Sequence, residues 1–138
     1  MFRCAGAGAA LAAATVLPVA GASIHRAAAS ARITERDFHI SAPKQLHAGE
    51  LRLLVHNKGP DAHELIVVRA GRGRLPLRSD GLTVNEEALG RRDVATLEPG
   101  TAGSARELRV HLAPGRYVLL CNMAGHYLGG MHTELIVH

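Results

Sequence analysis

Three side chains that bind soft metal ions lie close together near the C-terminus of the chain. Cys121, His126 and Met131 follow one another at the spacing C-x4-H-x4-M, and a second imidazole, His63, lies upstream behind the turn 57–61. One thiolate and two imidazoles in a plane, with a weak axial thioether, favour copper over harder cations and hold both of its oxidation states. The sequence therefore predicts a copper site with His63, Cys121, His126 and Met131 as its ligands.

Taken singly, each of these residues has an ordinary explanation. A lone methionine is usually a core residue, a surface histidine is usually only solvated, and a cysteine in a strand is usually a small buried hydrophobe. Their conjunction on one loop is what indicates a site. Gly125, Gly129 and Gly130 let the backbone of this loop curl, so that its three side chains can point at one centre.

Other chemistry fits the same residues less well. A dinuclear copper centre needs two cysteines on the loop, and only Cys121 is present there. A structural zinc site usually takes four closely paired Cys or His ligands. A Cys-His hydrolase needs an oriented base next to its nucleophile, and this apolar Gly-Met loop supplies no orienting group. With no open coordination position apparent, we expect no enzymatic activity.

The first 29 residues resemble a secretory signal peptide. Residues 9–20 form an apolar run of about signal-peptide length, and the small-residue sites behind it predict cleavage after Ala22 or Ala29. The run is too short for a comfortable membrane span, although a retained anchor is the alternative. We therefore expect an exported, periplasmic protein whose working domain is residues 30–138.

Length and charge limit the range of functions further. A chain of 138 residues, 47% of them hydrophobic, is typical of one globular domain. Loss of Arg3 and Arg26 with the signal leaves 14 of the 16 basic side chains against 12 acidic ones, a balance of +2 that does not indicate nucleic-acid binding. Cys121 is then the only thiol, whereas exported domains usually use cysteines in pairs. A free reactive thiol, an intermolecular bridge or a metal-bound thiolate would explain it.

Short apolar stretches separated by turn residues predict an all-β sandwich of about seven strands. Phe38 and Ile40 are expected to point inward at the end of the first strand. The expected strands are 32–40, 50–56, 63–69, 93–97, 105–112, 117–121 and 132–138.

The segment 70–92 is the least regular part of the pattern. A single helical turn is predicted at 85–89, with Asn85 as its N-cap. The arginines of this region are a candidate docking patch, although a solvated loop is the simpler interpretation. They are Arg69, Arg72, Arg74 and Arg78.

Three segments together resemble the cupredoxins, the small type 1 blue-copper proteins that include plastocyanin, azurin, rusticyanin and sulfocyanin. They are the turn and strand 57–65 (NKGPDAHEL), the stretch 114–117 (PGRY) that leads to Cys121, and the ligand loop 121–131. The resemblance implies a Greek-key β-sandwich with copper at one end. The loop spacing is closest to rusticyanin and sulfocyanin. Leu120 stands where plastocyanins place an aromatic residue, so their remote docking route is not expected here.

The resemblance also implies a role for each ligand. Cys121 would supply the thiolate that dominates the electronic properties of one type 1 copper, and His63 would be the buried imidazole. His126 would be the exposed imidazole through which electrons leave, and Met131 would be the weak axial ligand. The backbone N–H of Met123 is expected to donate to the Cys121 sulfur.

The predicted function is that of a small exported electron carrier that cycles between Cu(I) and Cu(II). A cytochrome, an oxidase or a copper nitrite reductase would dock at an apolar surface around His126, and a monomer is expected. The alternative is a periplasmic copper-binding or delivery protein on the same fold, although delivery favours Met- or His-rich sites and the chain has only three methionines. The Asn57 side chain is expected to steady the turn before His63. The predicted apolar collar comprises Pro60, Met123, Ala124, Leu128 and Leu46.

Overall fold

A computed structural model describes Met1 and residues 28–138, and in this part of the chain nine β-strands accompany one short helix and one 3-10 turn. The strands are β1 (Ala29–Arg36), β2 (His39–Ser41), β3 (Gln45–Leu46), β4 (Gly49–Asn57), β5 (His63–Arg69), β6 (Asp93–Gly100), β7 (Ala105–Leu112), β8 (Gly115–Leu120) and β9 (His132–Val137). The helix is α1 (Glu86–Leu89), and the 3-10 turn is η1 (Gly90–Arg92).

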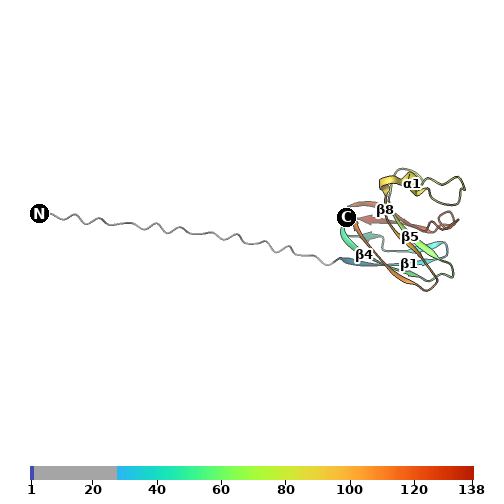
Figure 1. Cartoon of the computed structure of the whole chain (residues 1–138), viewed down its shortest axis with the longest axis horizontal. Coiled ribbons are helices and arrows are strands. Elements are labelled where there is room, and N and C mark those ends of the chain that lie inside the picture. The colour runs from blue at the N-terminus through green and yellow to red at the C-terminus, as the bar shows by residue number, and fades with distance from the viewer. Residues whose placement is uncertain (2–27) are drawn as a thin grey trace.

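The strands form two layers (Figure 1). One sheet has the order β2-β1-β4-β7, and the other has the order β3-β9-β8-β5-β6. Strand β1 runs parallel to β4 and β3 runs parallel to β9, whereas the other pairs are antiparallel. The predicted all-β sandwich is confirmed. The two strands beyond the expected seven, β2 and β3, are only three and two residues long.

Alternation along the strands builds the core between the layers. Leu53 and Val55 of β4 face Leu65 of β5 and Leu119 of β8 across this space, and none of these four side chains is exposed. Burial of each such side chain stabilises the fold by about 1.5–3 kcal/mol. Aromatic residues contribute little to this core. Tyr117 is the exception, and its hydroxyl donates to the carbonyl of Ala113 at 2.8 Å.

The segment 70–92, called the excursion below, covers the outer face of the second sheet. Its residues Leu75, Val84 and Leu89 pack with Ile66 and Val68 of β5 and with Leu120 of β8 in a second apolar cluster. The four arginines for which a solvated loop was expected are all exposed, whereas the apolar residues of the excursion form a packed layer. The predicted helical turn is confirmed, since the Asn85 side chain accepts from the backbone N–H of Ala88 at 3.2 Å.

The predicted signal peptide lies almost entirely outside the described residues, which exclude 2–27. In the described part of the chain, we find no helix that combines the length and the apolar character needed to cross a membrane.

Candidate metal centre

Three of the four predicted ligands converge at one end of the sandwich. His63 begins β5, Cys121 directly follows β8, and His126 lies on the loop between β8 and β9. The Nδ1 atoms of His63 and His126 lie 3.3 Å apart, and the Cys121 sulfur lies 3.9 Å from the first and 3.5 Å from the second. Within residues 28–138, this is the group of metal-binding side chains whose ligand atoms gather within 4.8 Å.

These separations fit a metal ion in the plane of the three donors. Bond lengths of about 2.0 Å to nitrogen and about 2.3 Å to sulfur, in a trigonal arrangement, require donors roughly 3.5–3.7 Å apart. The pairing of β5 with β6 shifts register between His63 and Leu65, and such irregularities often lie next to functional sites, where they change the direction of a side chain.

The loop that carries His126 and Met131 is held in shape by its own backbone. The N–H of His126 donates to Met123 at 2.9 Å, and the N–H of Met131 donates to His126 at 2.9 Å. The carbonyl of Met131 accepts from the N–H of Cys121 at 3.1 Å, which fixes the two ends of the loop together. Gly125 and Gly130 have φ angles of 80° and 103°, which favour glycine. Met131 is completely buried and belongs to the same apolar cluster as Cys121.

The orientation and protonation of His63 are set by Asp37. The His63 Nε2 atom lies 3.0 Å from an Asp37 carboxylate oxygen, so the proton of the neutral ring belongs on Nε2 and the lone pair of Nδ1 faces Cys121 and His126. Burial, followed by repulsion from His126, lowers the pKa of His63 despite the opposing effect of Asp37. The imidazole is thus held in the neutral form that binds metals.

Cys121 is a buried thiol in the absence of a metal ion. Burial raises its pKa to about 11, although backbone hydrogen bonds from Glu64 and Met123 to the sulfur act in the opposite direction. The predicted Met123 N–H donor is confirmed, and the Glu64 donor is an addition to it. Because metals bind the thiolate, uptake of a cation here releases a proton.

The turn before His63 is organised by Asn57, as predicted. The Asn57 amide donates to the carbonyls of Asp61 at 2.7 Å and Gly100 at 3.0 Å, and its oxygen accepts from the N–H of Gly59 at 2.9 Å. Asn57 is itself buried. These three bonds connect the turn to β6 and fix the position at which β5 begins.

The turn between β1 and β2 contributes two residues to the site that were not predicted from the sequence. Asp37 binds His63, and the Phe38 ring lies 5.5 Å from the His126 ring in an edge-on arrangement. The expectation that Phe38 points inward is wrong. Its φ of 59° turns the chain at this position and leaves the side chain 53% exposed, whereas the sequence shows only a continuing alternation.

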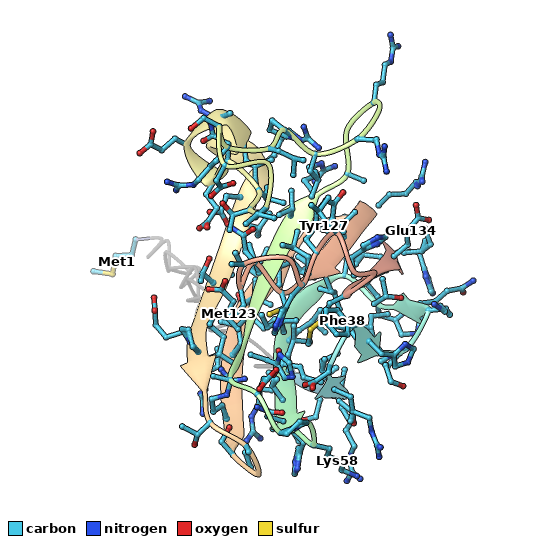
Figure 2. The ribbon with its side chains drawn as sticks, turned by 90° about the vertical axis from the view of Figure 1, so that its right-hand side faces the viewer. Met1, Phe38, Lys58, Met123, Tyr127 and Glu134 are labelled. Atoms are coloured by element: carbon cyan, nitrogen blue, oxygen red, sulfur yellow. The ribbon has the colours of Figure 1, made fainter. Side chains whose placement is uncertain are left out.

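The apolar surface around His126 differs from the predicted collar in two residues, because Phe38 joins it and Leu46 does not. The Phe38 ring packs edge-on against His126, and Figure 2 labels Phe38 and Met123 in the view onto this end of the molecule. Ala124, Leu128 and Pro60 are exposed on the ligand loop and on the turn before His63. Leu46 does not belong to this surface. It pairs with Val137, at the opposite end of β9 from the ligand loop, because β3 runs parallel to β9.

Asn122 attaches the excursion to the ligand loop. Its side-chain oxygen accepts from the N–H of Val84 at 2.6 Å, and its amide nitrogen donates to the carbonyl of Val84 at 3.1 Å and to Glu86 at 2.7 Å. The N–H of Gly125 also donates to Leu82 at 3.1 Å. The residue next to Cys121 therefore connects the site to the second apolar cluster, a contact that no local sequence pattern indicates.

A scan of protein-family models found no match, and neither did a comparison with curated protein sequences. Solved structures do match. Auracyanin B is 22% identical, with a TM-score of 0.61 over 80% of this chain and 89% of its own. Auracyanin A, a "blue" copper protein from Chloroflexus aurantiacus, is 17% identical, with a TM-score of 0.59 over 79% and 98%. Rusticyanin from Thiobacillus ferrooxidans is 12% identical, with a TM-score of 0.58 over 79% and 77%.

The chain has the cupredoxin fold. The resemblance stated from the sequence is confirmed at the level of the fold. Together with the cupredoxin neighbours, the cluster of His63, Cys121 and His126 beside Met131 supports one type 1 copper per chain.

Proposed function

We propose that this cupredoxin is a small exported blue-copper protein that carries one electron at a time between redox partners. One observation carries the proposal. The imidazole nitrogens of His63 and His126 and the thiol sulfur of Cys121 meet within 3.9 Å at one end of the sandwich, although 58 positions in the sequence separate His63 from Cys121. A soft donor set of this kind suits copper in both oxidation states.

In this proposal each ligand has a separate task. Bound copper supplies the one-electron Cu(I)/Cu(II) couple. Cys121 would provide a thiolate in a dry environment, and His63 and His126 would each add an imidazole nitrogen. Met131, which is completely buried, would supply a weakly bound thioether. His126 is the ligand that is half-exposed rather than buried, so its ring edge is the route by which electrons enter and leave.

The surroundings of the ligands suit electron transfer because they hold the donors in fixed positions. Asp37 fixes the His63 ring, Asn57 fixes the turn that precedes it, and Met131 and Cys121 are joined through their backbones. Such a network resists the rearrangement of ligands that would otherwise accompany each change in oxidation state. Burial also keeps water from His63, Cys121 and Met131, so these residues provide no place for a substrate to bind, and we propose no enzymatic activity.

The partner would dock against the apolar surface that surrounds His126. This surface is formed by Phe38, Leu128, Ala124 and Pro60. A cytochrome, an oxidase or a copper nitrite reductase is the proposed partner, and the carrier acts as a monomer. The small apolar patch suits a short-lived complex, because weak redox encounters have small interfaces.

We further propose that residues 1–29 act as a secretory signal and that the protein works in the periplasm as residues 30–138. The two predicted cleavage positions differ in what they leave of β1. Ala29 is the first residue of that strand and pairs with Leu51. Cleavage after Ala22 leaves the strand complete, whereas cleavage after Ala29 removes one pair at its end.

The test is a visible absorption spectrum of the purified protein during titration with Cu(II). We expect an intense blue or green band that saturates at one copper per chain, that reductant bleaches and that oxidant restores. Cys121→Ser should abolish the band, whereas the control Met123→Leu, in the same loop, should keep it. Faint colour, or copper that is lost on reduction, would contradict the electron-carrier function and favour copper delivery instead.

A further inference from the structure

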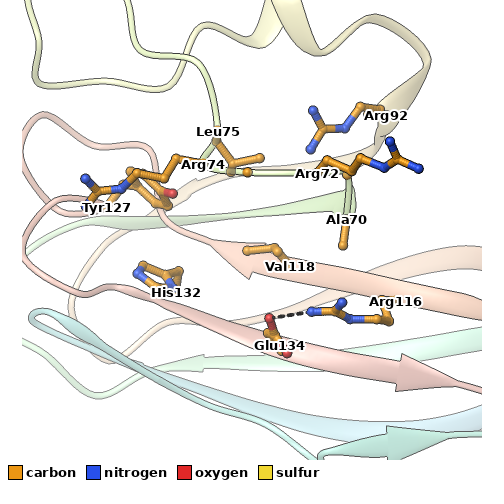
Figure 3. Close-up of a pocket in the computed structure, with 12 residues that line it drawn as sticks. Ala70, Arg72, Arg74, Leu75, Arg92, Arg116, Val118, Tyr127, His132 and Glu134 are labelled. Carbon is orange, nitrogen blue, oxygen red and sulfur yellow. Dashed lines mark hydrogen bonds and ion pairs between the residues drawn. The ribbon is translucent and has the colours of Figure 1, made fainter.

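A groove of about 550 Å³ lies on the outer face of the second sheet, beside the ligand loop. Val118 of β8 and Leu75 of the excursion form its apolar floor, and the loop residue Tyr127 and His132 of β9 line one end (Figure 3). Tyr127 directly follows His126, and its ring lies 5.0 Å from that of His132. The groove therefore reaches the same loop that carries the exposed ligand.

Four arginines line this groove, against a single carboxylate. Arg72 and Arg74 come from the excursion, Arg92 from η1 and Arg116 from β8. Arg116 forms an ion pair with Glu134 at 3.0 Å, drawn as a dashed line in Figure 3. Among the residues that the structure describes, the other three arginines have no carboxylate partner. The groove thus keeps most of its positive charge, because a guanidinium stays protonated at any physiological pH.

This concentration of charge is local. The proposed mature chain carries a balance of only +2, since Arg3 and Arg26 belong to the predicted signal. Three unpaired arginines along one groove therefore exceed the net charge of the whole domain. Self-repulsion of this kind destabilises the free protein, and a negatively charged occupant would relieve it.

The shape of the groove favours an extended occupant. Arg74 lies at the end near Tyr127, whereas Arg72 and Arg92 lie towards the other end, with Leu75 and Val118 between them (Figure 3). A single small anion would reach one end only. A volume of this size holds a molecule as large as a typical small-molecule ligand, about three or four residues of extended chain. Guanidinium groups bind carboxylates through paired N–H donors.

We propose that this groove binds an acidic, extended segment of the redox partner, rich in Asp and Glu, and thereby places that partner against His126. This proposal rests on the proposed electron-carrier function in one respect only, which is that the partner is a redox protein. The groove itself contains none of the four predicted ligands, so its binding of an acidic segment can be measured whether or not the site holds copper.

The experiment uses an acetylated and amidated hexaglutamate peptide as the probe, titrated at low ionic strength into the protein. Binding is followed by backbone amide NMR shifts, which we expect to be largest around the groove, and it should weaken steeply when salt is raised to 0.15 M, where charges are screened beyond about 8 Å. The variant Arg72→Gln/Arg74→Gln removes two exposed charges that make no hydrogen bond within the described chain. Its affinity should fall about fivefold.

The matched control is Arg32→Gln/Arg36→Gln, which removes two exposed charges from β1 in the other sheet and should change the affinity less than twofold. Equal weakening in both variants would overturn the proposal in favour of non-specific attraction. Binding of inorganic phosphate as tight as that of the peptide, or tighter binding to phosphatidylglycerol vesicles, would overturn it in favour of a small anion or a membrane.

The copper titration separates this proposal from the function on which it rests. A protein that turns blue and cycles reversibly, but does not bind hexaglutamate, would overturn the groove proposal alone. A protein that binds hexaglutamate through Arg72 and Arg74, but remains colourless with Cu(II), would contradict the electron-carrier function and leave the groove as an acidic-segment site.

Discussion

The bond between Asp37 and His63 gives the sharpest test of how this site is built. Asp37→Ala removes the acceptor from the His63 Nε2–H, which lies 3.0 Å away on a ring that is completely buried. A hydrogen bond to a charged acceptor contributes about 1.5–3 kcal/mol. Loss of such an orienting group typically weakens metal binding by about 10- to 100-fold. These two ranges agree, so we expect the affinity for Cu(II) to fall within them.

The assay is a competition titration in which a chelator of known affinity removes Cu(II) while the visible band is recorded. Asp37→Asn should lose less than Asp37→Ala, since its amide oxygen still accepts a hydrogen bond. Asp61→Asn is the matched control, because Asp61 also acts on His63 through its charge but makes no hydrogen bond to it within the described chain. Thermal unfolding of the copper-free variants would show that the fold is retained.

One result would refute the reasoning. If Asp37→Ala and Asp61→Asn weakened copper binding equally, by twofold or less, the carboxylate would act only through its charge. The tautomer of His63 would then be set by something other than the bond to Asp37.

Three further predictions concern the surroundings of the site and the stability of the sheets. A methyl group at Gly129 would overlap the Phe38 ring, so Gly129→Ala should lower the free energy of unfolding by about 1 kcal/mol. This loss of stability should vanish in the double variant with Phe38→Ala. A loss that persists there would show that the ring is not its cause. Asn122→Ala leaves the buried N–H and C=O of Val84 without partners, so it should lower the free energy of unfolding by about 2–3 kcal/mol. Hydrogen exchange of the Val84 amide should become at least tenfold faster. Unchanged exchange would contradict the role of Asn122 in attaching the excursion to the ligand loop. Hydrogen bonds from two arginine side chains lower the pKa of Glu107 to about 2, below its unfolded value of 4.5. The carboxylate therefore contributes stability above pH 4.5, and this contribution is lost as the pH falls towards 2. Glu107→Gln should lower the melting temperature at pH 7 but not at pH 2, and an equal effect at both would refute the assignment.

Much of the fold could be predicted because its signals are local. The strands at 63–69 and 105–112 coincide with β5 and β7, since a period of two and flanking turn residues specify a strand within its own sequence. The ligand loop was recognisable for the same reason, because three of the predicted ligands lie within eleven residues. The order and pairing of the strands in the two sheets depend on contacts between distant segments, so no local pattern predicts them.

The residues that were missed depend on contacts between distant segments. Asp37 and Phe38 reach the site through the parallel pairing of β1 with β4. Phe38 also has a positive φ, which a phenylalanine in the sequence does not indicate. Leu46 was misplaced for a similar reason, since two residues of β3 carry no signal for pairing with β9.

The covering of β5 by the excursion did leave a signal in the sequence. The run from Leu65 to Val68 is apolar at every position, and a continuous apolar strand is typical of a sheet buried on both faces. The prediction of a strand at 63–69 included no layer that would cover its second face. The other face, Ile66 and Val68, required the excursion to be a packed layer.

The direction of β1 determines which end of this domain faces a fusion partner or a solid surface to which the domain is attached. Both ends of the described domain emerge at the pole opposite the ligand loop: Ala29 pairs with Leu51 near the start of β4, and the N–H of His138 donates to Leu46, as the position of the C-terminus in Figure 1 shows. Eight residues of β1 separate that pole from Asp37, a distance of about 25 Å. A fusion partner or a surface linker at either terminus would therefore leave His126 facing outward. If such a linker attached the protein to an electrode, the protein would exchange electrons readily with molecules in solution and poorly with the electrode itself.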